Sequence, residues 1–366
     1  MDGNRTNTVG RRARRVLRHR AMAWLTGLVA VAALSAACTE QPPPTLPPNG
    51  GVVTTFAGSP GQPGAVDGTG SAARFIAPAQ SSFDHDGNLV VADHTSVRSI
   101  TPSGVVTTLA GGAQCGLVDG VGTAARFCNA HGIAVNSVGD VFVTDVRGIR
   151  RISPGGVVTT FFDRNVECAD VPCQPSGLAI DSADNLYTAD VLGHTIMKIS
   201  PAGVASTIAG TPDMPGHVDA TGADARFDRP VGIALDATGN LYVTEIGNHD
   251  VRKVAPTGAV ATLAGAGSCG WTDGTGTDAS FCAPDGIAVD AQGDLYVVAY
   301  GNFNSTVRRV TAAGVVTTLA GSTTMGSADG TGAAAQFRNP HGIALDRATG
   351  VLYVSDSGNQ TIRKVS

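Results

Sequence analysis

Short apolar runs separated by turn-forming residues fill the chain after residue 50. In one stretch, four such runs rich in Val and Ile follow one another, at residues 132–136, 140–145, 149–153 and 157–161. Residues with a branched β-carbon favour strands, and the Gly, Asn, Asp, Ser and Pro residues between the runs favour turns. The pattern therefore predicts four short β-strands in this stretch.

The same pattern occurs six times along the chain. Within each repeat, a strand close to GVVTTxAG is followed by a loop close to DGTGxAARF and by strands close to PxGIAVD, LYVAD and IRKI. The first of these strands starts at Gly51, Gly104, Gly156, Gly203, Gly258 and Gly314, at intervals of 47 to 56 residues. Four-stranded repeats of this length are typical of a β-propeller, in which each repeat forms one blade. The repeat that starts at Gly156 is the shortest and lacks the Phe that the other five keep: Phe75, Phe127, Phe227, Phe281 and Phe337.

The two ends of the repeat region complement each other. The last IRKI-type strand ends at Val365, so the sixth blade has no fourth strand after it, while the strand at 52–58 has no blade of its own. A closed ring leaves no exposed sheet edge. We therefore predict an all-β, six-bladed propeller over residues 51–366, closed by strand 52–58 joining the last blade.

The N-terminus has the features of an export signal. Residues 1–20 contain seven arginines, and residues 21–37 are almost entirely apolar, which predicts a signal peptide over 1–37. The sequence LSAAC at 34–38 resembles the lipobox of bacterial lipoproteins, although its Leu is four residues before the Cys instead of three. This predicts a lipid anchor at Cys38 in the bacterial cell envelope, facing the periplasm or the exterior. Ordinary cleavage near Cys38, which would give a secreted protein, and an uncleaved anchor remain as alternatives.

The segment after the signal peptide is a Pro-rich tether over 38–50, with five prolines within residues 39–50. This composition favours an extended spacer. Without residues 1–37 the chain loses seven of its 25 basic and one of its 30 acidic residues, which leaves 18 against 29 and a net charge of −11. Binding to phosphates needs clustered Lys and Arg, so nucleic acid is excluded as a partner.

Six cysteines lie in the repeat region, an even number that is compatible with disulfides in an exported protein. Cys115 and Cys128 flank one DG loop, and Cys269 and Cys282 flank another at the same spacing of thirteen residues. Each pair is present together or absent together among the repeats. This predicts the local bridges Cys115–Cys128 and Cys269–Cys282, and a third bridge Cys168–Cys173. A metal site built from these cysteines is disfavoured because the pairs lie in separate blades.

The consensus PxGIAVDxxGxLYVADxxNxxIRKI resembles the NHL repeat, and the resemblance covers residues 51–366. It implies a propeller whose usual role is to bind other molecules on one face or in the central channel. The first blade departs from the pattern, because Gln80-Ser81-Ser82-Phe83-Asp84 stands where other blades have the GIAVD strand.

One position of the repeat varies in its chemistry. In a propeller of this type, the residue before the glycine of GIAVD faces the mouth of the central channel, and the six residues there are Ala79, His131, Ser176, Val231, Asp285 and His341. We predict a binding site formed by His131, Asp285 and His341. Two imidazoles and a carboxylate could bind zinc or a similar ion. The alternative is a polar rim that holds water.

A weaker resemblance connects the same position to peptidyl-hydroxyglycine amidating lyases. In those propellers, three blades carry zinc-binding histidines in motifs like PHG, which His131 and His341 match. The third position is Val231, so that zinc site is incomplete here, and Asp285 in the adjacent blade could compensate.

The recurring acidic residues are expected to be structural. Each DG loop supplies one or two carboxylates, too few for calcium, so a turn with glycine at positive φ is the better explanation for Asp67, Asp119, Asp219, Asp273 and Asp329. The acids after LYVA are expected to cap the following turn: Asp93, Asp145, Asp190, Glu245 and Asp356. Variable loop tips, including Trp271, Met214, Met325 and the CADVPC loop, are expected to serve recognition.

Two functions follow from these observations. The sequence has no nucleophile elbow, P-loop or dinucleotide fingerprint. The leading prediction is a non-catalytic, monomeric binding module for a protein, peptide or glycan, without a cofactor. The alternative is a metal-dependent lyase or lactone hydrolase with zinc or calcium at the channel mouth.

Overall fold

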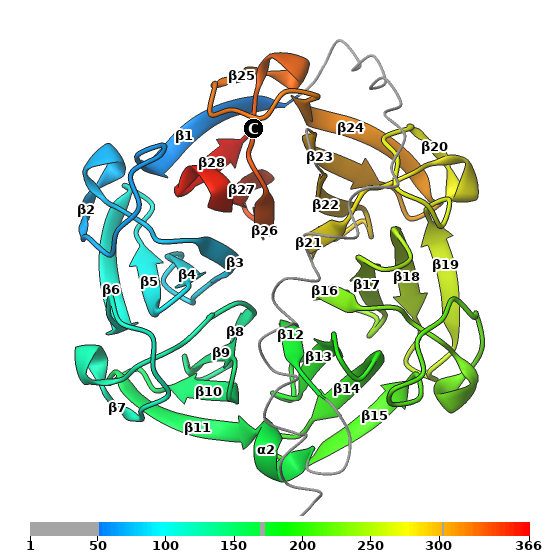
Figure 1. The fold of residues 1–366 in the computed structure, drawn as a ribbon, viewed down its shortest axis with the longest axis horizontal. Coiled ribbons are helices and arrows are strands. Elements are labelled where there is room, and N and C mark those ends of the chain that lie inside the picture. Colours follow the sequence, from blue (N-terminus) through cyan, green and yellow to red (C-terminus); the bar gives the residue numbers. More distant parts are fainter. Residues whose placement is uncertain (1–50, 169–172, 302–303) are drawn as a thin grey trace, which may run out of the picture. The chain divides into compact units, whose positions relative to one another are not determined.

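The computed structural model describes residues 51–168, 173–301 and 304–366, which form a ring of six β-sheets (Figure 1). This confirms the predicted all-β, six-bladed propeller. The predicted signal peptide, the tether and Cys38 lie outside the described residues. Among the residues that are described, no helix is long and apolar enough to cross a membrane.

The sheets are numbered here as blades in chain order, each given from its innermost strand outward. Blade 1 contains β3 (Pro78–Phe83), β4 (Leu89–Asp93), β5 (Ser96–Ile100) and β6 (Val105–Gly111). Blade 2 contains β8 (Ile133–Val135), β9 (Val141–Asp145), β10 (Gly148–Ile152) and β11 (Val157–Asp163). Blade 3 contains β12 (Pro175–Ile180), β13 (Leu186–Asp190), β14 (Thr195–Ile199) and β15 (Ala205–Ala209).

The remaining blades follow the same order. Blade 4 contains β16 (Pro230–Leu235), β17 (Leu241–Glu245), β18 (Asp250–Val254) and β19 (Val260–Ala264). Blade 5 contains β21 (Pro284–Val289), β22 (Leu295–Tyr300), β23 (Ser305–Val310) and β24 (Val315–Ser322). Blade 6 contains β26 (Pro340–Asp346), β27 (Val351–Asp356), β28 (Thr361–Val365) and β1 (Val52–Gly58).

Short elements in the loops complete the fold. Two-residue strands extend the outer edge of four blades: β2 (Gly68–Thr69), β7 (Gly120–Val121), β20 (Gly274–Thr275) and β25 (Gly330–Thr331). Single 3₁₀ turns follow at η2 (Gly70–Ala72), η3 (Gly122–Ala124), η4 (Gly222–Asp224), η5 (Gly276–Asp278) and η6 (Gly332–Ala334), and another is η7 (Ser357–Asn359). The α-helix α2 (Arg164–Glu167) lies between blades 2 and 3.

The first and last strands of the propeller close the ring as predicted. Strand β1 pairs with β28 in antiparallel register, from Val53 opposite Val365 to Gly58 opposite Thr361 (Figure 1). The last blade therefore takes its outer strand from the beginning of the propeller.

Five blades contain a fully buried arginine on their third strand. In blade 4, Arg252 donates to Glu245 Oε2 at 2.7 Å and to Asp219 Oδ1 at 2.5 Å, and its guanidinium carbon lies 5.2 Å from the ring centre of Phe227. Charge-assisted hydrogen bonds and the aromatic face satisfy a cation that burial would otherwise destabilise. The equivalent arginines are Arg98, Arg150, Arg308 and Arg363.

These contacts correct the expected role of the acids after LYVA. Asp93 accepts the backbone N–H groups of Ile76 and Ala77, which precede the inner strand, and it pairs with Arg98. Burial raises the pKa of Asp93 to about 6, although these hydrogen bonds and the arginine oppose the shift. Turn capping is confirmed for Asp145 and Asp190, which accept the N–H groups of Arg147 and Gly193 in the following turn, but it is incomplete, because acids at this position also pair with the buried arginine or hold the start of the inner strand.

Blades 3 and 5 depart from this cluster in different ways. In blade 3, Met197 takes the position of the arginine, and the short loop has neither the Phe nor the DG aspartate. In blade 5, Ala299 takes the position of the inner acid, opposite Pro284, so Arg308 pairs with Asp273.

The structure contains disulfides between Cys115 and Cys128, Cys168 and Cys173, and Cys269 and Cys282, the three pairs that the repeat predicts. The prediction for Trp271 is wrong. Its side chain is 8% exposed and belongs to the apolar core that includes Cys282, so this loop residue serves packing.

Candidate binding site at the channel mouth

The six variable residues of the repeat form the rim of the channel. In five of the six blades the next residue is a glycine, which lets neighbouring blades approach closely at this level. A Cβ atom on Gly232 would collide with the carbonyl oxygen of Asp285 in the next blade, and one on Gly342 would collide with that of Ala79. Neighbouring blades therefore approach backbone to backbone at this level. This requirement explains the invariant glycine of the GIAVD strand in blades 2 to 6.

Hydroxyl groups on the second strands fix the rim residues. Thr244 Oγ1 accepts the N–H of Gly232 at 2.9 Å and donates to the carbonyl oxygen of Asp285 at 2.5 Å. Thr144 makes the same bridge between Gly132 and Ser176. These hydrogen bonds join consecutive blades and set the backbone position of the rim.

Blade 1, where the repeat pattern is broken, also supports the rim. The departing sequence still forms strand β3, and Gln80 takes the position of the glycine. Its backbone N–H donates to the carbonyl oxygen of His131 at 3.0 Å, while the His131 N–H donates to the Thr144 carbonyl at 2.9 Å. The backbone of His131 is thus held from both neighbouring strands.

Most other histidines in the described residues have structural partners. His194 Nδ1 accepts the N–H of Arg229 at 3.1 Å, and His249 Nδ1 accepts the N–H of Ala283 at 3.2 Å. Both donors have positive φ, 50° and 38°, and precede the rim residues by two positions. These histidines therefore hold a strained turn into the next inner strand. His217 is paired with Asp250, with Nε2 2.7 Å from Oδ2.

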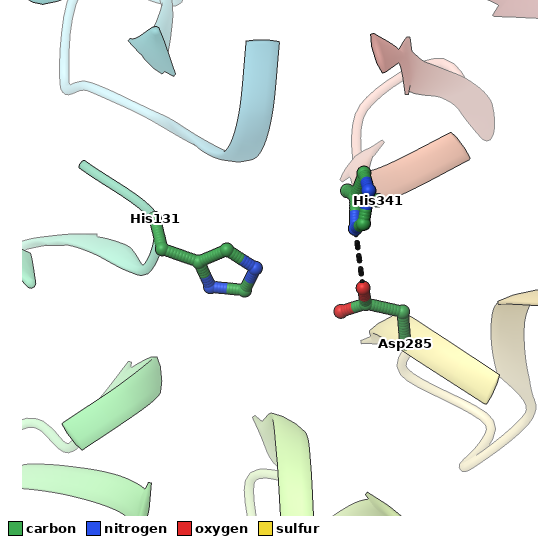
Figure 2. A group of neighbouring side chains, drawn as sticks. All are labelled: His131, Asp285 and His341. Atoms are coloured by element: carbon green, nitrogen blue, oxygen red, sulfur yellow. Dashed lines mark hydrogen bonds and ion pairs between the residues drawn. The ribbon is translucent and has the colours of Figure 1, made fainter. Parts of the chain in front are cut away.

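His131, Asp285 and His341 come together across the channel from blades 2, 5 and 6 (Figure 2). One potential ligand atom from each lies within 4.8 Å of the other two. His341 Nδ1 is 2.6 Å from Asp285 Oδ2, and the two imidazole rings are 6.3 Å apart between centres. Among the rim residues, the structure thus brings together the three that the sequence singled out, while Val231 and Ala79 supply apolar side chains.

The charges at the mouth are unequally distributed. Burial opposes protonation of His341, but its hydrogen bond to Asp285 and the charge of that carboxylate raise its pKa overall. Burial lowers the pKa of His131, assisted by the charge of His341 and opposed by Asp285. At neutral pH, His341 is therefore the more readily protonated imidazole. His131 more readily stays neutral, with a nitrogen lone pair free to accept a hydrogen bond or bind a metal ion.

Two further residues complete the site. Ser176 Oγ is 3.2 Å from His131 Nδ1, so the serine orients this ring. The Tyr300 ring lies 5.0 Å from the His341 ring, and burial, followed by the charge of Asp285, raises the pKa of Tyr300. The sequence did not identify Tyr300 as a site residue. The signal was that blade 5 reads LYVVAY where the repeat has LYVAD.

Beyond the glycines, the channel becomes apolar. A cavity of about 190 Å³ is lined by inner-strand side chains that include Ile133, Leu178, Ile233, Ile287 and Ile343. The site therefore has a polar rim above an apolar channel.

The comparisons with known proteins agree with this architecture. The NHL repeat family matches residues 337–365. Teneurin-4 from Mus musculus is 28% identical over 223 residues, which are 50% of this chain and 8% of that protein. The chain therefore spans a small part of this relative.

Two solved structures from Bacteroides thetaiotaomicron share the fold. A protein of unknown function has a TM-score of 0.69 and 20% identity, with 87% of this chain and 76% of that chain covered. An auxiliary nutrient binding protein has a TM-score of 0.66 and 17% identity, with the same shares covered. Identities this low support the fold alone. The described residues are thus a six-bladed β-propeller in which residues 337–365 match the NHL repeat.

Proposed function

We propose that this chain is an exported, lipid-anchored propeller that binds a protein, peptide or glycan without chemical change, on the face that carries the channel mouth. The observation that carries the proposal is the convergence of His131, Asp285 and His341 at the one repeat position whose chemistry changes from blade to blade. The buried arginine clusters recur with nearly the same contacts, as a scaffold does. Residues that depart from a repeat and meet in space are the better candidates for recognition.

The DG loops, which lead from the outer edge of the blades to the inner strands, also support a binding face. Several of their apolar side chains are exposed, including Val66, Leu117, Val118, Met214 and Val218. The name of the auxiliary nutrient binding protein that shares the fold supports a binding role for such a ring. The three disulfides support a place outside the cytoplasm, because disulfides persist in oxidising compartments.

The test is partner capture. The purified chain is immobilised and incubated with an envelope fraction, and a double variant, His131→Ala with His341→Ala, is compared with the wild type. His85→Ala is the matched control, because His85 is an exposed histidine that follows the end of β3, whereas the rim residue Ala79 lies at the start of that strand. We expect a protein, peptide or glycan that the wild type and the control retain and that the double variant loses. Equal retention by all three proteins would refute the mouth as the binding site.

The anchor is tested separately. If Cys38 carries the lipid, a Cys38→Ser variant leaves the membrane fraction, and mass spectrometry of the wild type finds a lipid-modified N-terminal peptide. A wild-type chain that is already released and begins at an unmodified residue supports ordinary cleavage instead.

A second candidate function is a lyase or lactone hydrolase that uses a metal at the mouth. It is favoured by the meeting of two imidazoles and a buried carboxylate, groups that serve as acid, base or metal ligands. Turnover of a panel of lactones, measured before and after chelation and in the His341→Gln variant, tests it. Turnover that survives both treatments contradicts this mechanism.

A further inference from the structure

The channel mouth contains a buried carboxylate that lacks enough partners. Asp285 is 2% exposed, and its Oδ2 contacts His341 while its Oδ1 has no hydrogen-bond partner. A buried carboxylate is costly unless its oxygens are paired or coordinate a metal. The unpaired oxygen therefore indicates that the site is completed by a ligand.

The groups around this carboxylate define the chemistry of that ligand. His131 and His341 approach it from two other blades, and the three donor atoms lie within 4.8 Å of one another (Figure 2). Imidazole nitrogen suits Zn²⁺ and neighbouring divalent transition metals, whereas Ca²⁺ and Mg²⁺ prefer a shell of oxygens. Two nitrogens and one carboxylate favour the transition-metal class.

One of the three donors has the outer partner that metal ligands usually have, and the backbone of two is fixed. Ser176 contacts the Nδ1 atom of His131 at 3.2 Å and leaves Nε2 for another partner. The carbonyl group of Asp285 is fixed by Thr244, and the backbone of His131 is held by Gln80 and Thr144. Outer partners that orient each ligand are a regular feature of metal sites.

We infer that His131, Asp285 and His341 bind one divalent transition-metal ion of the zinc class at the channel mouth. The ligand set differs from three histidines in alternate blades, because Val231 is aliphatic and the third donor comes from blade 5 instead of blade 4. Three protein ligands leave a fourth position open, as in catalytic and ligand-binding zinc sites.

Binding requires a small adjustment of the donors. With bonds of about 2.0–2.1 Å, tetrahedral donors lie roughly 3.4 Å apart. The atoms spread over 4.8 Å must move closer, while the 2.6 Å contact between His341 and Asp285 must open and release its shared proton. The ion replaces that proton as the partner of the carboxylate.

This inference rests on the proposed location of the binding site and names part of what that site recognises. The open position of the ion would take an oxygen donor of the partner, such as a carboxylate or a sugar hydroxyl group.

Metal uptake by the full chain tests the inference. The protein is purified in detergent, stripped with a chelator and dialysed against Zn²⁺, and bound metal is measured by elemental analysis. We expect one equivalent per chain in the wild type. His131→Gln and His341→Gln should each weaken binding about 100-fold or more, and Ser176→Ala about 10- to 100-fold, as for the loss of an outer partner.

Two controls make the result decisive. His85→Gln removes an exposed histidine outside the site and should bind Zn²⁺ like the wild type. Asp285→Asn keeps the size of the buried side chain, and circular dichroism checks that each variant is folded. The visible spectrum of the Co²⁺-loaded chain should change in the three ligand variants and stay unchanged in the control. No uptake by the wild type, or equal uptake by all folded variants, would overturn the inference.

The outcome is separable from that of partner capture. A chain that takes up no Zn²⁺ but retains a partner through His131 and His341 refutes the metal and keeps the binding function. A chain that takes up Zn²⁺ but retains no partner supports the metal site and refutes the binding function.

Discussion

Arg252 in blade 4 and Met197 in blade 3 occupy the same position of two neighbouring sheets. Around Arg252, an inner acid, a DG aspartate and a phenylalanine ring surround the buried guanidinium group. Around Met197, the phenylalanine, the DG aspartate and the arginine are all missing, while the inner acid Asp190 remains and accepts backbone N–H groups from Gln174 and Gly193. The arginine, the phenylalanine and the DG aspartate are therefore kept or lost together, whereas the inner acid varies independently, since blade 3 keeps it without the arginine and blade 5 has Ala299 in its place.

The same comparison separates scaffold from site. A buried cation needs a counter-charge and hydrogen-bond acceptors, so the DG aspartate and the phenylalanine accompany the arginine in all five blades that have it. The rim position has no such requirement, because its backbone is fixed by glycine and threonine contacts and its side chain points to the channel. Chemistry can vary there at little cost to folding, and this is where His131, Asp285 and His341 gather.

The largest expected effect follows from making blade 4 resemble blade 3. Arg252→Met leaves Glu245 buried without its cation, and breaking a buried ion pair by removal of one partner costs about 3–5 kcal/mol. Chemical denaturation followed by circular dichroism measures the loss. Met197→Leu is the matched control in blade 3 and should cost less than about 1.5 kcal/mol, since it conserves volume. Equal losses in the two variants would contradict the role given to the arginine cluster.

The fold was predictable because the strand pattern and the turn residues repeat six times, and each repeat supports the same interpretation. The closure by Val52–Gly58 followed from counting strands, and the disulfides followed from cysteines that appear in pairs at one spacing. Local pattern was sufficient for these features.

The buried arginine cluster was not predictable in the same way. Arg98 and Asp67 are 31 residues apart, and the pattern of a strand such as SVRSI does not reveal that its arginine is fully buried. Trp271 was misjudged for the same reason, because a loop position does not show whether a side chain faces solvent or the neighbouring strands.

The candidate site lies between these two cases. Its residues were found because the rim position could be aligned across blades, but the distances among His131, Asp285 and His341 depend on how six blades close into a ring. Tyr300 was missed because it is the last residue of a strand that is one residue longer than the consensus, and only the structure connects this change with His341.

A smaller effect is expected from the disulfide of blade 2. The DG loop of blade 4 has the same pairing without a bridge, since Gly116 and Gly216 donate to Phe127 and Phe227 at 3.1 and 3.0 Å. The bridge is therefore not needed to shape the loop and acts mainly on the unfolded chain. Replacing Cys115 and Cys128 by Ser should cost about 3 kcal/mol or less. Denaturation with and without a reductant measures this, and an altered hydrogen-exchange pattern of the folded loop would argue against it.

A pH-dependent effect is expected where blade 4 differs from the other blades. The contact with Asp250 raises the pKa of His217 above its ordinary value of 6.5. A group whose pKa is higher in the folded state stabilises the fold fully below its unfolded pKa, and this contribution is lost as the pH rises through the folded pKa. The melting temperature should therefore fall as the pH rises from about 6.5, and less steeply in His217→Gln.

His85→Gln serves as the control for that measurement, because His85 is exposed. The pKa of His341 is also raised, so the wild-type profile contains a contribution from both histidines. The difference between the profiles of His217→Gln and His85→Gln gives the contribution of His217 alone. Parallel profiles for His217→Gln and the wild type would show that the ion pair with Asp250 adds nothing to stability.

The smallest effect on stability is expected at the channel mouth, where function should suffer most. His131→Ala removes one hydrogen bond to Ser176, worth about 1 kcal/mol, and leaves the backbone contacts of this residue in place. The same variant should lose the partner in the capture experiment, whereas Arg252→Met, assayed while still folded, should retain it. Loss of binding without loss of stability in one variant, and the reverse in the other, would separate the recognition role of the rim residue from the structural role of the buried arginine. A His131→Ala variant that melts as early as Arg252→Met would instead place His131 in the scaffold, together with His194 and His249.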